Sequence, residues 1–330
     1  MSELQRVLQA RNWMKTNENF LKTWHAHVGY KLDLFDSFKR PSRVDKVAAS
    51  REFSPELLQR WIDVGIQVGH MKEGRGGRYR AKKRLIKYAS KSSAESVGIL
   101  LREMMELHIP TLLQYPSLLE EDQRLTYLTD KFADIVAETS TLLEKAAVHP
   151  ILKWVKKEKP ASVIDLGCGL GGYLKSIHDK YPKTELIGVE LSSEVAAKAQ
   201  QRAGDKIDIR QGDINEFLDT FDGRTDMIMA HNLLYYFTRE ERQRLYKRFS
   251  NALSSRGSVT IICPLVKAKY GAAFTTAFNT FMTAHENLHP LPSIEEIDTD
   301  AGRAGFKVED VKPLIREGGW YLVTLKKTGQ

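Results

Sequence analysis

The sequence predicts an α/β fold in which a mostly parallel sheet follows a smaller, mostly helical N-terminal domain. Three observations lead to this prediction. Short apolar strands alternate with helical patterns from about residue 162 onward, as expected for strands joined by crossover helices. A glycine-rich turn separates the first of these strands from the helix after it. The N-terminal part instead combines helical patterns with one candidate hairpin.

Length and composition fit a soluble protein of two domains. The 330 residues exceed the usual size of one domain, and 42% hydrophobic residues permit a full core. No apolar run is long enough to cross a membrane, and the N-terminus lacks the apolar region of a secretory signal. The two cysteines, Cys168 and Cys263, do not suggest a disulfide framework. We therefore expect a cytoplasmic protein without a membrane partner.

The N-terminal elements follow one another as helices and a hairpin. A helical pattern over Asn17–Phe38 repeats apolar residues at three- to four-residue steps and predicts a buried or dimer-facing stripe. That stripe consists of Phe20, Trp24, Val28 and Leu32. Two shorter helices are expected at Arg43–Ala49 and Ser54–Val64, the second with Ser54 in a favourable N-cap position. Strands at Gln67–Met71 and Arg78–Arg80 then flank a turn at Gly74–Gly77. This order is typical of a winged helix.

The glycine-rich turn follows a strand at Ser162–Leu166 and indicates a nucleotide-shaped cofactor. Gly167, Gly169 and Gly172 also satisfy the spacing of dinucleotide-binding turns. Asp165, two residues before the first glycine, favours a cationic ligand over the phosphates of a dinucleotide.

Three further strands each end in polar residues at the expected spacing. The strand Glu185–Glu190 ends in an acid that can take both hydroxyls of a ribose. A short strand at Ile207–Gly212 is closed by Asp213, and a fourth strand at Thr225–Ala230 opens onto His231 and Asn232. A helix at Thr238–Leu253 and strands at Gly257–Cys263, Phe306–Val311 and Trp320–Lys326 complete seven strands, the last two close enough for a hairpin.

These four motifs resemble those of class I S-adenosylmethionine-dependent methyltransferases, whose Rossmann-like sheet has seven strands. The N-terminal part is similar to the winged-helix dimerisation domain of small-molecule O-methyltransferases. The resemblance implies a dimerisation domain at residues 1–95, a helical connector lining the acceptor pocket at 96–152 and the methyltransferase domain at 153–330. It also implies a homodimer, a small-molecule acceptor from secondary metabolism, and S-adenosylmethionine held by Asp165, Gly167, Gly169, Gly171, Glu190, Leu191, Asp213, Ile214, His231 and Asn232.

A basic segment between Lys72 and Lys91 contributes much of the net charge of +8. A solvated surface is one interpretation, and a phosphate-contacting wing is the other. The leading hypothesis is a small-molecule methyltransferase without a nucleic-acid partner. A methyltransferase or regulator that binds nucleic acid through this segment is the alternative.

The catalytic base of the resembled family is a histidine after the fourth strand, where this sequence has Tyr235. Tyrosine is a poor base at neutral pH because its ordinary pKa is near 10. His231 and His285 are therefore the other catalytic candidates. The surroundings of His285 are also similar to those in α-keto acid C-methyltransferases, which use a ferric ion. Metal-assisted C-methylation thus stays open, although two ligands do not define a metal site and none is assigned.

Overall fold

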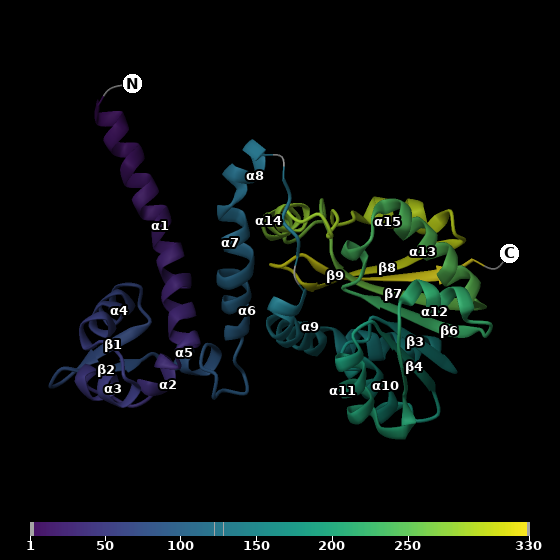
Figure 1. The fold of residues 1–330 in the computed structure, drawn as a ribbon, viewed down its shortest axis with the longest axis horizontal. Helices are drawn as coiled ribbons and strands as arrows, with labels where there is room; N and C mark the ends of the chain where they lie inside the picture. Colours follow the sequence, from purple (N-terminus) through teal and green to yellow (C-terminus); the bar gives the residue numbers. More distant parts are fainter. Residues whose placement is uncertain (1–2, 122, 128, 329–330) are drawn as a thin grey trace. The chain divides into compact units, whose positions relative to one another are not determined.

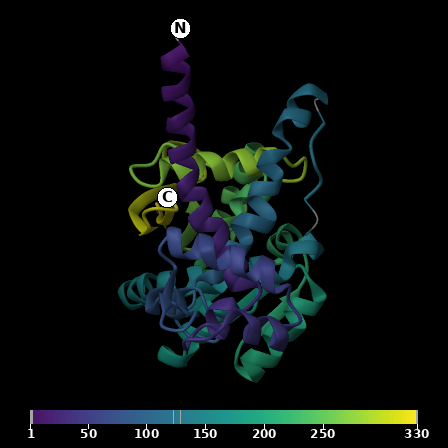
Figure 2. The ribbon, with the colours of Figure 1, turned by 90° about the vertical axis from the view of Figure 1, so that its left-hand side faces the viewer.

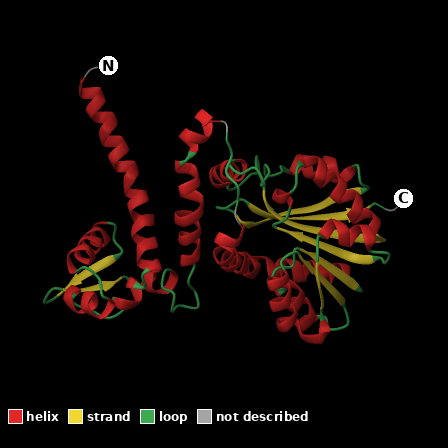
Figure 3. Cartoon of the chain, in the orientation of Figure 1, coloured by secondary structure: helices red, strands yellow, loops and turns green. Residues whose placement is uncertain are grey.

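The computed structural model describes residues 3–121, 123–127 and 129–328. The chain divides into two compact units (Figures 1 and 3). The first contains the residues up to Pro110 together with Phe132–Thr139, and the second contains Thr111–Lys131 and the chain from Ser140 onward. We describe each unit separately.

The N-terminal half of the chain is helical apart from one hairpin. Its elements are α1 (Glu3–Lys31), α2 (Leu34–Ser37), α3 (Val44–Arg51), α4 (Pro55–Gln67), β1 (Met71–Gly74), β2 (Arg78–Ala81), α5 (Lys83–Tyr88), α6 (Gly98–Glu103), the π-helical turn η1 (Met104–His108), α7 (Ile109–Leu113), α8 (Tyr115–Glu121) and α9 (Thr129–Glu158). Ser54 caps α4 by accepting a hydrogen bond from the Leu57 backbone N–H, as its position before Pro55 predicts. The core of the first unit contains Phe35, Phe38 and Ile62, all fully buried.

Two expectations for this unit need correction. The first helix begins at Glu3 and extends beyond the other elements of its unit (Figures 1 and 2), because no proline or glycine interrupts residues 3–28. Its expected stripe is only partly covered, since Phe20 and Leu32 are exposed whereas Trp24 and Val28 pack against the core. The first hairpin strand begins at Met71, because Gln67 is still the last residue of α4.

The second unit is built on the seven-stranded sheet. Its further elements are β3 (Ser162–Leu166), α10 (Gly172–Lys180), β4 (Glu185–Glu190), α11 (Ser193–Ala203), η2 (Gly204–Lys206), β5 (Asp208–Gln211), α12 (Ile214–Thr220), β6 (Thr225–His231), η3 (Leu234–Tyr236), α13 (Arg239–Ala252), β7 (Leu253–Pro264), α14 (Ala272–Thr283), α15 (Ile294–Gly302), β8 (Phe306–Ile315) and β9 (Trp320–Lys327). The order across the sheet is β5-β4-β3-β6-β7-β9-β8. Strands β3 to β7 are mutually parallel, and β9 is antiparallel to both neighbours.

Helices cover both faces of this sheet. One face packs against α12, α13 and α15 through a core that includes Leu218, Phe249 and Ile297. The other packs against α9 and α10 through a core that includes Val155 and Leu174 (Figure 1). The predicted α/β fold class is therefore confirmed. Among the described helices, none is long and apolar enough to span a membrane.

Candidate active site

The glycine-rich turn lies at the carboxyl end of β3, where the strand order of the sheet reverses. The neighbours of β3 are β4 on one side and β6 on the other. The chain moves outward from this point in both directions, and in sheets of this kind ligands bind outside the carboxyl ends of the strands at such a point. The glycine-rich turn after β3, Glu190 at the end of β4, and His231 at the end of β6 therefore lie along one edge of the sheet.

The turn requires glycine for its backbone conformation. Gly167, Gly169 and Gly171 have φ angles of 69°, 54° and 73°, a region that other residues adopt only at a cost in energy. A Cβ atom added at Gly169 would meet nothing within 4 Å, so this side of the turn is open. The Gly167 backbone N–H donates to the Val189 carbonyl at 2.8 Å, which fixes the turn to β4.

Asp165 is a buried acid with two other acids near it. Its side chain is 2% exposed, and its Oδ2 atom has no hydrogen-bond partner among the described residues. Burial raises the pKa of this carboxyl well above its ordinary value, and the nearby Glu144 and Glu190 carboxylates raise it further. A buried carboxylate among carboxylates is complementary to a cation, so the residues present fit the ammonium and sulfonium groups of S-adenosylmethionine.

Glu144 of α9 is a member of this acidic group that the sequence did not indicate. A Cβ atom added at Gly172 would lie 2.1 Å from both carboxylate oxygens of Glu144, so this carboxylate contacts the start of α10. Burial raises the pKa of Glu144 as well, against the opposing effect of Arg202 and Lys145. No motif includes Glu144, because a single acid within a helical pattern is usually solvated.

Glu190 is held at the end of β4 by two backbone donors. The Gly169 N–H donates to Oε2 at 3.0 Å, and the Ser192 N–H donates to Oε1 at 2.9 Å. Each carboxylate oxygen can accept a second hydrogen bond, so the orientation suits the two ribose hydroxyls expected there. Leu191 beside it is 65% exposed, which leaves an apolar surface next to this carboxylate.

Asp213 caps the helix that follows β5. Its Oδ1 atom accepts hydrogen bonds from the backbone N–H groups of Asn215 and Glu216, at 2.7 and 3.2 Å, so the other oxygen remains outside these bonds. Ile214 is 6% exposed and belongs to the core beneath the sheet. Asp213 and Ile214 therefore hold the loop after β5 in place, and the side chain of Ile214 turns toward the core.

His231 and Asn232 end the fourth strand. His231 is buried and its ring lies 3.0 Å from the Thr260 hydroxyl through Nε2, with no hydrogen-bond partner for Nδ1 among the described residues. Burial lowers its pKa to about 3, which makes protonation during catalysis unfavourable and argues against a role as base. Asn232 has a φ angle of 53° and accepts a hydrogen bond from the Trp320 indole at 3.0 Å.

An aromatic cluster forms beyond the fourth strand. It consists of Tyr127, Tyr235, Phe274, Phe278, Phe281, His285 and Trp320. The ring of Tyr235 meets Phe278 edge-on at a centroid distance of 6.2 Å, and Phe278 also lies 5.6 Å from Trp320. Through the hydrogen bond of Trp320 to Asn232, the cluster is continuous with the end of β6.

His285 lies within this cluster, just after α14. Its Nδ1–H donates to the Phe281 carbonyl at 2.8 Å, which leaves Nε2 as the nitrogen with the lone pair. Burial lowers the pKa of His285, so the imidazole is neutral at physiological pH. Tyr235 and His285 both contact aromatic residues of α14, and Phe278 and Phe281 link them. Sequence reasoning missed Trp320 and Phe278, although the repeated aromatic residues of α14 were a visible signal.

No group of three or more histidine, cysteine or acidic side chains is placed to hold a metal ion within the described residues. Metal-assisted C-methylation stays a hypothesis.

Comparison with known proteins identifies a methyltransferase domain in this part of the chain. The family model described as "Methyltransferase domain" matches residues 163–257, which include all four motifs. The malonyl-[acyl-carrier protein] O-methyltransferase of Anoxybacillus flavithermus is 33% identical over 96 residues, which cover 27% of this chain and 34% of the relative. The chain thus matches about a third or less of the length of its curated relatives.

The fold is shared over nearly the whole chain with solved methyltransferase structures. An O-methyltransferase family protein from Burkholderia thailandensis has a TM-score of 0.81 at 17% identity, covering 97% of this chain and 98% of that one. Human N-acetylserotonin methyltransferase, solved with S-adenosylmethionine, has a TM-score of 0.77 at 17% identity, covering 100% and 99%. Residues 163–257 therefore match a methyltransferase domain, and the chain as a whole shares the fold of these solved methyltransferases.

Proposed function

We propose that this protein is a cytoplasmic enzyme of secondary metabolism that transfers a methyl group from S-adenosylmethionine to an oxygen of a small aromatic molecule. The observation that carries the proposal is Asp165, a buried carboxylate with an unpartnered oxygen at the end of β3. Its acidic neighbours offer no compensation, so a cationic cofactor completes the site. The buried, unpaired Cys168 and Cys263 are consistent with a reducing compartment.

The cofactor would be held by residues from each of the first three motifs. Asp165 and Glu144 would face its cationic end, Glu190 the ribose hydroxyls, and Leu191 and Asp213 the adenine. When bound, S-adenosylmethionine supplies a methyl group already activated by its sulfonium. The protein then has to align the acceptor oxygen with that methyl group and exclude water, and such alignment contributes about 7 to 11 kcal/mol to lowering the barrier.

The aromatic cluster supports a planar acceptor. Phe274, Phe278 and Trp320 offer ring faces and edges that suit an aromatic substrate. His285 is the base that we propose, because its neutral ring presents the Nε2 lone pair while Nδ1–H is fixed by the Phe281 carbonyl. The Tyr235 hydroxyl would orient the acceptor, since tyrosine is a poor base.

The N-terminal region would serve assembly. We propose residues 1–95 as a homodimerisation domain and 96–152 as a connector that lines the acceptor pocket, as the similarity to small-molecule O-methyltransferases implies. The exposed apolar residues of α1, among them Val7, Trp13 and Phe20, are compatible with a partner surface. Light scattering of the full chain measures this stoichiometry.

Calorimetry with S-adenosylhomocysteine, followed by a methyl-transfer screen, tests the proposed activity. The screen covers phenols, hydroxyquinones and α-keto acids, with and without a chelator, and mass spectrometry reads the product. We expect cofactor binding, and transfer to a phenol or hydroxyquinone that the chelator does not reduce. A protein that binds no cofactor refutes the proposal, and chelator-sensitive methylation of a keto acid supports the C-methylation alternative.

The variant His285→Gln tests the base. We expect kcat to fall about 100- to 10,000-fold, the usual contribution of a general base, with cofactor affinity unchanged. The control His289→Gln changes a nearby histidine that the proposal does not use. An unchanged kcat in His285→Gln would move the base elsewhere.

A further inference from the structure

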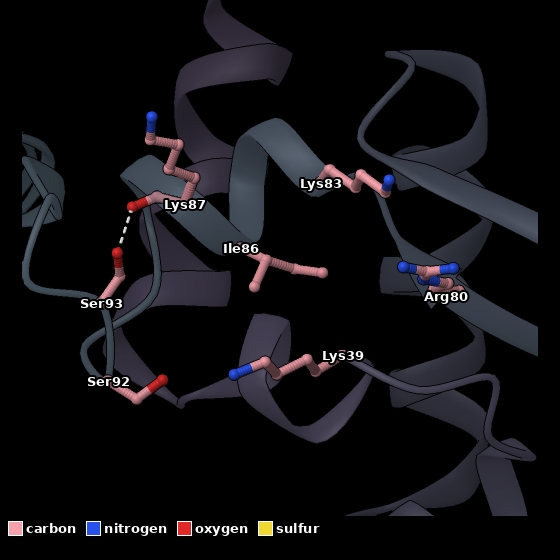
Figure 4. Close-up of a pocket in the computed structure, with 7 residues that line it drawn as sticks. All are labelled: Lys39, Arg80, Lys83, Ile86, Lys87, Ser92 and Ser93. Atoms are coloured by element: carbon pink, nitrogen blue, oxygen red, sulfur yellow. Dashed lines mark hydrogen bonds between the residues drawn. The ribbon is translucent and has the colours of Figure 1, made fainter.

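A basic hollow in the first unit has no role in the proposed methyl transfer. It has a volume of about 320 Å³ and is lined by Lys39, Arg80, Lys83, Ile86, Lys87, Ser92 and Ser93. Figure 4 shows the cationic side chains arranged around Ile86. Every lining residue belongs to the first unit, whereas the methyltransferase motifs lie in the second. The hollow is therefore a separate feature of the chain.

Backbone hydrogen bonds hold the walls of the hollow together. The Ala81 N–H donates to the Phe38 carbonyl at 2.9 Å, which joins the end of β2 to the residue before Lys39. Ser42 and Tyr79 exchange two backbone hydrogen bonds on the same side of the hairpin, at 3.0 and 2.8 Å. Phe38 and Ala81 are buried in the core. Lys39 and Arg80 are thus positioned by rigid neighbouring backbone.

Serine side chains fix the remaining wall. The Ser93 hydroxyl donates to the Lys87 carbonyl at 2.5 Å (Figure 4). The Ser92 hydroxyl donates to Asp36, whose other oxygen accepts from Ser90 at 2.5 Å. Each serine hydroxyl has only one hydrogen, and Ser92 and Ser93 already donate theirs within the wall. The lysines and the arginine are therefore the donors available to a ligand.

The charges around the hollow are poorly balanced. Lys87 pairs with Glu95 at 2.8 Å, but within the described part of the chain no ion pair neutralises Lys39, Arg80 or Lys83. Lys72 is the cross-strand partner of Arg80 in the hairpin, and like charges in that position repel. Asp36 and Glu95 are the acids in this network. A net positive charge therefore remains, which an anion would offset.

The size and lining of the hollow indicate which anion it suits. Its volume lies at the lower end of the range for small-molecule sites. The Arg80 guanidinium can bind two oxygens of a phosphate at once, and the lysines add point charges around it. Ile86 provides an apolar surface for the organic part of a ligand.

We propose that this hollow binds a small organic phosphate, with the phosphate on Arg80 and Lys83 and the organic part against Ile86. Lys39 contributes a further positive charge to the same ligand. This phosphate-binding site is separate from the proposed methyl transfer, and it assigns a binding function to part of the basic segment between Lys72 and Lys91. All four cationic side chains are exposed, so binding weakens as the salt concentration rises.

Calorimetric titration of the full chain with inorganic pyrophosphate, at low and at high salt, tests the site. We expect saturable binding at low salt, weakened about tenfold or more by Arg80→Gln combined with Lys83→Gln. Arg75→Gln is the matched control, because it removes a positive charge from the hairpin turn outside the hollow. The control should bind as the wild type does, and thermal melting confirms that each variant is folded.

Three results would overturn the proposal. The first is the absence of saturable pyrophosphate binding by the wild type at low salt. The second is equal weakening by Arg75→Gln, which would indicate a diffuse charge effect. The third is tight binding of a short DNA duplex that pyrophosphate does not displace and that depends on Arg75, which would assign the segment to nucleic acid.

Discussion

Each unit of the chain buries a titratable side chain that has an unpartnered polar atom. In the first unit this is His25, whose ring stacks on Trp61 at 4.2 Å and whose Nδ1 lies 3.0 Å from Nδ1 of His70. In the second unit, Asp165 at the end of β3 is such a side chain, as is His231, and Asp165 is the one compared with His25. Both side chains are almost completely buried, so burial does not distinguish them.

The neighbours of the two groups do distinguish them. The pKa of His25 falls to about 3, mainly through burial, so its ring is neutral and packs as another aromatic side chain. Asp165 instead has two further carboxylates near it, and packing alone cannot offset that repulsion. We infer that the acidic cluster around Asp165, which a cation can stabilise, marks a ligand site, whereas the neutral, stacked ring of His25 belongs to a structural core.

The largest expected effect comes from replacing Asp165. Asp165→Asn should weaken S-adenosylhomocysteine binding about 100-fold, because a buried charge pair loses one partner. The same change should leave the unfolding free energy unchanged or raise it by about 1 kcal/mol, since Asn is neutral where the buried carboxyl must bind a proton to avoid an unpaired charge. Calorimetry measures the first quantity and urea denaturation the second.

Asp179→Asn is the control for this change, because Asp179 is exposed and, among the described residues, its ion-pair partner is Lys175 on α10. It should alter neither quantity appreciably. Loss of stability in Asp165→Asn with unchanged affinity would make Asp165 a structural residue like His25, and the comparison would fail.

Two glycines next to these groups offer a matched test of packing. A Cβ atom at Gly65 would lie 2.3 Å from Nε2 of His25, and one at Gly172 would lie 2.1 Å from the carboxylate of Glu144. The stacked His25 ring cannot move aside, whereas the end of Glu144 can. Gly65→Ala should therefore cost about 1 to 3 kcal/mol of stability with cofactor affinity unchanged.

Gly172→Ala should show the reverse pattern. Displacement of the Glu144 carboxylate should reduce cofactor affinity a few-fold, with a smaller loss of stability than in Gly65→Ala. Urea denaturation and calorimetry on both variants compare the two. A larger stability loss in Gly172→Ala would show that the acidic group is as rigidly packed as the His25 core.

Acid should destabilise the fold through His25. Its pKa is about 3 in the folded protein and 6.5 ordinarily, so the unfolded chain binds more protons between these values. The stabilisation is complete above pH 6.5 and declines as pH falls, by about 2 kcal/mol between pH 6.5 and 5. His70, whose pKa burial also lowers, acts in the same direction.

Urea denaturation at pH 7 and pH 5 measures this decline. His25→Leu should reduce the difference between the two pH values by about half or more, whereas His149→Leu, at an exposed position on α9, should not. Unchanged pH dependence in His25→Leu would place the titrating group elsewhere.

The sequence predicted those parts of the site that depend on short segments. Asp165, the glycines and Glu190 follow from the local order of strand, turn and helix, and the strands were placed correctly to within a few residues. Glu144 and Trp320 could not be predicted in the same way. They reach Gly172 and Asn232 only after the sheet has folded, and neither stands in a pattern of its own.

The smallest effect, and the sharpest test of the acidic group, concerns Glu144. Burial raises the pKa of both Glu144 and Asp165, so the free protein holds protons there that a cationic ligand would expel. Affinity for S-adenosylhomocysteine should therefore increase with pH, by at most about tenfold per pH unit for each proton released, until both carboxyls are ionised. Calorimetry in buffers of different ionisation enthalpy counts the protons. Glu144→Gln should flatten this dependence and reduce the protons released, whereas Glu185→Gln, at the opposite end of β4 from Glu190, should do neither. A pH dependence unaltered by Glu144→Gln would leave Asp165 as the titrating group and reduce Glu144 to a packing contact of Gly172.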